Sequence, residues 1–146
     1  MTKPLQCEIT IDQPLDRLYK TLLEQQLLYF RHFDASIADL NVGTTIRRDF
    51  YTKIRAHAIG GQTRVTEIKE NDCFGLESSY GANHIVQLFT FTAVGDRQTK
   101  VAYSETSVFE KASHQTNYGF VSWFYTFFFK RQTKKRLKQL GALACQ

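Results

Sequence analysis

Histidine and cysteine, the residues most often found at metal and nucleophilic sites, are few in this chain and widely separated. The histidines are His32, His57, His84 and His114, and none stands at a metal-ligand spacing from another His, Cys or carboxylate. No HExxH motif occurs. A catalytic histidine needs a partner that orients it, and no such partner follows from the sequence. We therefore assign no catalytic residue and expect no metal and no cofactor.

Two carboxylates inside predicted strands are the next candidates for chemistry. Glu105 should share a strand face with Val101 and Tyr103, which would point toward the concave side of a sheet. There it would anchor a polar group of a ligand, or form half of a buried pair with a raised pKa. The alternative is a face turned to solvent, or a Lys or Arg opposite Glu105. An enzyme would have to use Glu105, Tyr103, Glu77 and His84, and an enzymatic role has the weakest support.

Length and composition indicate a folded chain without covalent cross-links. The 146 residues suit one domain, 1–146, and the 14% aromatic content argues against disorder. Cys7, Cys73 and Cys145 are too few and too scattered for a disulfide framework. The start of the chain has no apolar run, and no segment reaches the roughly 18 apolar residues of a membrane span. These features predict a cytoplasmic protein.

The first third of the chain predicts a strand followed by a helix. Residues 5–11 alternate apolar and polar side chains, which is the period of a half-buried strand. Asp12 or Gln13 can cap a helix that has Pro14 at its first position, and apolar residues then recur at helical spacing to about Arg31 or Phe33. Residues 34–43 have no clear period and predict a loop or a short helical turn.

The middle of the chain predicts an antiparallel meander, because five strand-like segments are joined at hairpin-sized intervals. Gly60-Gly61 is interpreted as a turn that ends the first of them, since no phosphate-loop pattern follows it. A curved sheet with its helices on one face is the economical packing for this order of elements. The fold class is therefore α+β. The expected strands are residues 44–59, 63–69, 73–80, 84–94 and 100–109.

A long C-terminal helix is expected over residues 117–140, aromatic in its first half and basic in its second. At about 100° per residue one narrow stripe carries the only apolar residues of the second half, so this stripe should pack inward. In the first half the same stripe consists of small residues, which would let the helix approach the sheet closely or leave space beside it. The stripe consists of Gly119, Ser122, Thr126, Thr133, Leu137 and Leu140.

The opposite face of this helix is aromatic and then basic, and two interpretations stay open. Exposed, it would form a patch for a homodimer, a protein partner or a membrane surface. Buried, its aromatic half would close the core or line a cavity, and its cations would be a solvated helix end that complements the C-terminal dipole. No recognition-helix motif accompanies the basic residues, so we expect no nucleic-acid partner. The interface candidates are Phe120, Phe124, Phe127, Phe128, Lys134 and Lys135.

Several stretches resemble the START-like superfamily, also called helix-grip or SRPBCC, in which a curved antiparallel sheet wraps a long C-terminal helix. Residues 9–19, ITIDQPLDRLY, resemble its opening strand and Pro-initiated helix. The chain is more closely similar to a family of short bacterial proteins, domain of unknown function 3284. That similarity rests on the opening, residues 73–80, and residues 119–140 with FKRQTKK. The family supplies no catalytic residues.

The resemblance implies a six-stranded helix-grip fold, and helix-grip proteins commonly hold an apolar ligand between sheet and helix. We therefore predict a non-enzymatic domain that binds a small hydrophobic ligand in such a cavity. The alternative is an interaction protein that uses the aromatic and basic helix for a homodimer, a partner or a membrane surface. The cavity candidates are Gly119, Ser122, Trp123, Thr126, Tyr103 and Glu105.

Overall fold

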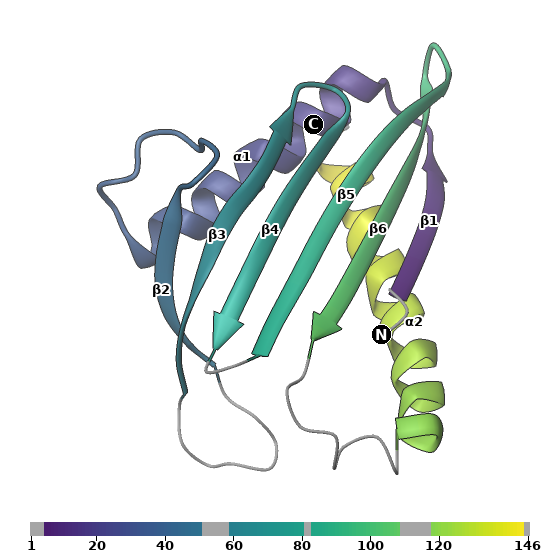
Figure 1. Cartoon of the computed structure of the whole chain (residues 1–146). Helices are drawn as coiled ribbons and strands as arrows, with labels where there is room; N and C mark the ends of the chain where they lie inside the picture. The colour runs from purple at the N-terminus through teal and green to yellow at the C-terminus, as the bar shows by residue number, and fades with distance from the viewer. Residues whose placement is uncertain (1–4, 51–58, 81–82, 109–117, 145–146) are drawn as a thin grey trace.

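The computed structural model describes residues 5–50, 59–80, 83–108 and 118–144, with side chains over 5–47, 60–79, 84–106 and 131–144. The chain runs strand, helix, five strands, helix, as the sequence predicts (Figure 1). The elements are β1 (Leu5–Ile11), α1 (Leu15–Phe33), β2 (Thr45–Phe50), β3 (Ile59–Lys69), β4 (Cys73–Tyr80), β5 (Asn83–Gly95), β6 (Gln98–Val108) and α2 (Tyr118–Ala144).

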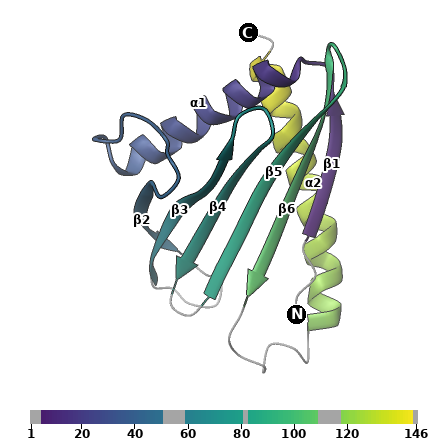
Figure 2. The same cartoon turned by 45° about the horizontal axis from the view of Figure 1, so that its top comes forward.

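The six strands form one curved sheet in which every neighbouring pair is antiparallel. Its order is β1-β6-β5-β4-β3-β2, so β2 to β6 make a meander and β1 closes the far edge against β6. Both helices lie on the same face of this sheet, behind it in Figure 1 and again in Figure 2. This is the α+β architecture that the sequence predicts.

The core lies between this helix-facing side of the sheet and the two helices. Helix α1 begins at Leu15, so the predicted start is one residue early: Pro14 is the N-cap, in place of Asp12 or Gln13, and its backbone is extended, with φ at −61° and ψ at 145°. It buries one stripe, Leu18, Tyr19, Leu22 and Phe30, at helical spacing. The Tyr19 ring meets Phe91 edge to face, with centroids 5.4 Å apart. Helix α1 therefore anchors on the middle of the sheet.

Helix α2 packs against β1 and α1 through the stripe predicted for its second half. Thr133, Leu137 and Leu140 are all buried. The helix continues four residues past Leu140, through Gly141 to Ala144. A Cβ at Gly141 would stand 2.7 Å from Ile11 Cγ2, so glycine permits the close approach of α2 to β1. The helix expected over residues 117–140 is therefore longer at its C-terminal end than the sequence predicts.

The meander differs from expectation at two places. The turn predicted at Gly60-Gly61 is wrong: both residues lie inside β3 and pair with Asp49 and Arg48 of β2. Residues 44–59 are therefore not one strand, and residues 51–58 lie outside the described part. The second difference is a bulge: the register of β3 shifts between Val65 and Glu67, which interrupts the period of two and brings both Val65 and Ile68 to the same face. This bulge returns both apolar side chains to the core.

Candidate functional site

A hydrogen-bonded group of polar side chains lies on the helix-facing side of β5 and β6. Gln87 Nε2 donates to the hydroxyl of Tyr103 over 2.6 Å. The same hydroxyl donates to Glu105 Oε2 over 2.9 Å. Tyr103 is buried, and Gln87 and Glu105 are half-buried. We call Gln87, Tyr103 and Glu105 the polar triad.

The strand period and the register place the triad. Tyr103 and Glu105 are two residues apart on β6, so they share a face, and Gln87 pairs directly with Glu105 across the ladder. The partner of Tyr103 on β5 is Phe89, whose ring centroid lies 4.8 Å from that of Tyr103. The prediction that Glu105 shares an inward face with Val101 and Tyr103 is therefore correct in geometry. The triad stands at the polar end of an apolar face.

The surroundings of Tyr103 keep its phenol neutral. Burial is the main reason that the pKa of Tyr103 is raised well above its ordinary value, and the nearby Glu105 carboxylate adds to the effect. The positive charge of Arg136, from α2, acts in the opposite direction on the same pKa. At neutral pH Tyr103 is thus a hydrogen-bond donor to a carboxylate. It is poorly suited to act as a general base.

A second polar pair extends the same face toward β3. Ser78 and Thr63 are cross-strand partners, both buried, and their hydroxyl oxygens lie 2.9 Å apart. Ser78 also pairs with Ile85 of β5, which lies two residues before Gln87 and so on the same face. The helix-facing side therefore carries hydrogen-bonding groups on four adjacent strands, β3 to β6.

The structure separates the four residues that an enzyme would have used. Glu77 and His84 lie on the outer face of the sheet, where His84 Nδ1 stands 3.5 Å from Glu77 Oε1. The sheet stands between this pair and the polar triad. His32 is exposed on α1, and His57 and His114 lie outside the described residues. Within the described part of the chain, no three His, Cys, Asp or Glu residues could hold a metal ion together.

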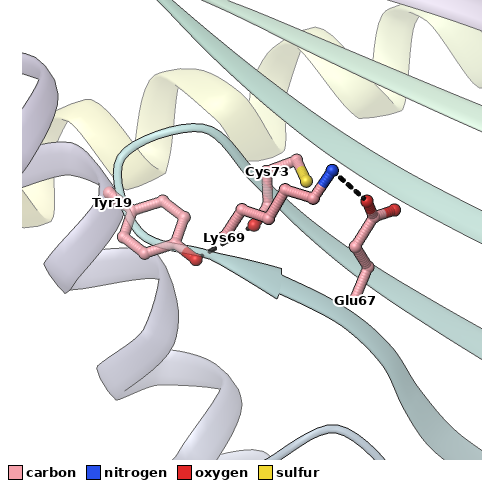
Figure 3. Close-up of polar contacts among 4 residues, drawn as sticks. All are labelled: Tyr19, Glu67, Lys69 and Cys73. Carbon is pink, nitrogen blue, oxygen red and sulfur yellow. Dashed lines mark hydrogen bonds and ion pairs between the residues drawn. The ribbon is translucent and has the colours of Figure 1, made fainter.

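The buried cysteine Cys73 lies at the start of β4, beside α1 (Figure 3). The hydroxyl of Tyr19 donates to its carbonyl oxygen over 2.9 Å, which ties α1 to the sheet. Burial raises the pKa of the Cys73 thiol, and the Glu67 carboxylate raises it further. Lys69 pairs with Glu67 over 3.3 Å and opposes the shift only in part. Cys73 is therefore a structural thiol with little nucleophilic character.

The predicted site residues of α2 fall into two groups. The helix backbone is described throughout, but the side chains of its first half are not. Lys134 and Lys135 are exposed on the second half. The predictions that rest on the first half stay predictions, for the cavity and for the interface alike. They concern Gly119, Phe120, Ser122, Trp123, Phe124, Thr126, Phe127 and Phe128.

A shallow depression of about 240 Å³ lies at the opposite end of the sheet from the triad, at the turn between β1 and α1. This turn is held by Gln98, which donates to Asp12 over 2.8 Å, and by Thr99, which donates to the carbonyl of Gln13 over 2.8 Å. The two hydrogen bonds fix the shape of this turn, so the depression is accounted for by the packing of the turn. Its lining residues are Asp12, Gln13, Pro14, Arg17 and Arg97.

Sequence reasoning found two members of the triad and missed Gln87. The signal was present, because Gln87 occupies a position between Ile85 and Phe89 where the period of two predicts an inward, apolar residue. A polar residue at such a position has to find a hydrogen-bonding partner. Only the pairing of β5 with β6 identifies that partner as Tyr103.

The fold is shared with solved structures of very different sequence. The TTHA0849 protein of Thermus thermophilus matches with a TM-score of 0.64 and 13% identity, over 98% of this chain and 97% of that one. The Zhui aromatase/cyclase of Streptomyces sp. R1128 matches with a TM-score of 0.58 and 8% identity, over 97% of this chain and 93% of that one. Ara h 8.0201 matches with a TM-score of 0.57 and 12% identity, over 98% of this chain and 97% of that one. The fold is thus of the helix-grip class.

The family is defined by sequence. A model of the family described as "Domain of unknown function (DUF3284)" matches residues 5–126. The chain therefore belongs to that family, as its resemblance implied. No curated protein matches the chain. No helix in the described residues is both long enough and apolar enough to cross a membrane.

Proposed function

We propose that this protein binds a small, mainly apolar molecule on the helix-facing side of its sheet, with the polar triad as the hydrogen-bonding anchor. The observation that carries the proposal is the position of Gln87, Tyr103 and Glu105 at the end of a mainly apolar face. A few placed polar groups in apolar surroundings are typical of small-molecule sites. The sheet then supplies both the apolar contact and the orientation of the ligand.

The chemistry of Gln87 suggests which polar group the ligand carries. Within the described residues, its side chain makes one hydrogen bond, from Nε2 to the hydroxyl of Tyr103. An amide has two donor hydrogens and an acceptor oxygen, so a second donor and the oxygen can meet a ligand. A hydroxyl or a carbonyl group on an apolar skeleton matches these groups. Glu105 and Tyr103 fix the orientation of the amide.

The remaining contacts of the proposed site come from the sheet and from α2. Phe89 stacks against Tyr103 and supplies an apolar wall. Four residues of α2 that we predict to line the cavity belong to this proposal: Gly119, Ser122, Trp123 and Thr126. The shared helix-grip fold supports the proposal, since Zhui is an aromatase/cyclase of the same architecture. Identity to that protein is too low to carry its reaction over.

Native mass spectrometry of the purified protein, followed by thermal-shift measurements with paired apolar ligands, tests the proposal. Each pair should share a skeleton and differ only in a hydroxyl or carbonyl group. We expect the polar member of a pair to bind more tightly. Gln87→Leu should weaken that member about tenfold, the equivalent of one hydrogen bond, and leave the other member unchanged.

The matched control is Gln62→Leu, the same substitution at an exposed position of β3. It should leave every affinity unchanged. The proposal is wrong if the protein carries no adduct and no apolar ligand raises its melting temperature. It is also wrong if the two glutamine variants lose affinity equally.

A further inference from the structure

The second half of α2 carries a dense set of positive charges and no negative one. From Tyr118 to Ala144 the helix contains no Asp or Glu. Among its described side chains five cations are exposed, and all of these but Arg136 lie on one side: Arg131, Lys134, Lys135 and Lys138. At about 100° per residue they fall within an arc of about 100°, roughly opposite the buried stripe of Leu137 and Leu140. We call these four residues the cationic arc.

The helix dipole does not account for the cationic arc. Cations complement the dipole only within the last turn of a helix. Helix α2 runs to Ala144, and its last turn contains no basic residue. Lys138, the arc residue nearest the end, precedes Ala144 by six residues. The dipole would explain these cations if the helix ended at Leu140, but it does not explain them in a helix that runs to Ala144.

Nor does the rest of the described chain neutralise the arc. The ion pairs within the described residues join Lys69 to Glu67 and His84 to Glu77, and neither involves α2. Within the arc, Arg131 stands four residues from Lys135, and Lys134 stands four residues from Lys138. Like charges at this spacing repel and weaken a helix. An external anionic partner would remove this repulsion.

We propose that the cationic arc of α2 docks the protein on an anionic membrane surface. A protein interface needs an apolar, charge-poor centre, and here four charges occupy the centre of the exposed face. A bilayer needs no such anchor, because its charge is spread over a plane and attracts every nearby Lys and Arg. The buried stripe holds the helix on β1 and α1, so the arc meets a plane without unfolding anything.

The composition and placement of the first half of α2 favour lipid over nucleic acid. Tyr, Phe and Trp make up eight of the twelve residues from Tyr118 to Phe129, directly before the basic segment. Aromatic residues beside Lys and Arg are typical of helices that lie at a bilayer surface. In both views this half of α2, coloured green, continues beyond the start of β1 (Figures 1 and 2).

Vesicle co-sedimentation tests the proposal with the full chain. Vesicles of phosphatidylcholine alone are compared with vesicles that also contain phosphatidylserine, at low and at physiological salt. We expect binding to the anionic vesicles only, and weaker binding as salt rises. Each basic residue near an anionic surface strengthens binding roughly fivefold. The triple variant Lys134→Gln, Lys135→Gln and Lys138→Gln should therefore bind about a hundredfold less.

The control variant removes the same charge elsewhere: Lys20→Gln, Arg31→Gln and Arg47→Gln, all exposed and all outside α2. It should bind within a fewfold of the parent, and circular dichroism should show both variants folded. The proposal is overturned if the parent ignores anionic vesicles at low salt, or if the two triple variants lose binding equally. Tighter, arc-dependent binding to a duplex DNA or RNA probe would assign the arc to nucleic acid instead.

Discussion

At the scale of single residues, the roles of the polar side chains follow from which face of the sheet they occupy. Glu77 and Glu105 are both interior to strands, and the sequence treats them alike. In the structure Glu105 accepts a hydrogen bond from Tyr103 on the helix-facing side, whereas Glu77 meets His84 on the outer side. The first can contact a ligand between the layers, and the second contacts solvent. Face assignment therefore decides which carboxylate belongs to the site.

The two described cysteines should be unreactive in the folded protein. Cys7 and Cys73 are each 6% exposed, and burial raises the pKa of the Cys73 thiol, so its thiolate is scarce at neutral pH. In a Cys145→Ser background, a disulfide reagent should label both thiols at least roughly tenfold more slowly in buffer than in denaturant. The readout is the released chromophore. Equal rates in the two solvents would show that Cys73 is accessible and would contradict its structural role.

At the scale of elements, small residues decide how closely the layers and strands approach. Gly75 pairs with Glu67 beside the bulge of β3, and a Cβ there would stand 2.9 Å from Thr66 Oγ1. Gly141 plays the corresponding part between α2 and β1. Neither glycine lies in a turn: Gly75 is inside β4 and Gly141 is inside α2. Close packing explains both positions.

Gly141→Ala should destabilise the protein, although alanine favours a helix. The new methyl group would meet Ile11 Cγ2 at 2.7 Å, and overpacking of this kind costs about 1–3 kcal/mol. The gain in helix propensity offsets about 1 kcal/mol of this cost. We expect a net loss of up to about 2 kcal/mol in the free energy of unfolding, measured in urea.

A double-mutant cycle checks the cause. Ile11→Ala removes the clashing methyl group, so Gly141→Ala should cost much less in that background. Ala142→Gly, at the neighbouring exposed position, measures helix propensity alone and should lower stability by about 1 kcal/mol. If Gly141→Ala stabilises the parent, α2 does not approach β1 as closely as the structure has it.

At the scale of the whole molecule, the helices make the two faces of the sheet chemically different. One face buries the apolar residues of all six strands beneath α1 and α2. The other carries charged and polar residues such as Arg64 and His84 to solvent. The polar triad belongs to the buried side, so its protonation is linked to the stability of the fold.

Stability should fall at alkaline pH, in part through Tyr103. The pKa of Tyr103 is raised in the folded protein, so above about pH 10 the unfolded chain loses this proton first. The contribution of the neutral Tyr103 to the free energy of unfolding is fully present below the ordinary tyrosine pKa. It is lost as pH rises through the pKa of Tyr103 in the folded protein. Tyr103→Phe should cost about 2–3 kcal/mol at neutral pH, because two hydrogen bonds are lost and one of them joins the hydroxyl to a carboxylate.

Between about pH 9.5 and 11 the Tyr103→Phe variant should lose stability less steeply than the parent, by up to about 1 kcal/mol per pH unit. Urea unfolding followed by circular dichroism at several pH values gives both slopes. Parallel curves for parent and variant would mean that Tyr103 ionises normally in the folded state, and that it is not enclosed as described.

The sequence by itself determined the order of the elements and their type, since periods of two and of 3.6 residues are local properties. It placed β1, α1 and β4 with few errors, and the inward stripe of Thr133, Leu137 and Leu140. It also identified the helix-grip class and the family. Gly60-Gly61 misled it, because turn propensity predicted the end of a strand where β3 instead pairs with β2.

Only the tertiary structure decided which distant residues meet. The pairing of Gln87 with Glu105 depends on strand register, and the separation of Glu77 and His84 from Tyr103 depends on which face the helices cover. The continuation of α2 past Leu140 brings Gly141 close to Ile11, a contact between layers that no local pattern specifies. Contacts across the sheet and between layers are set by the whole chain at once, so no short stretch of sequence specifies them.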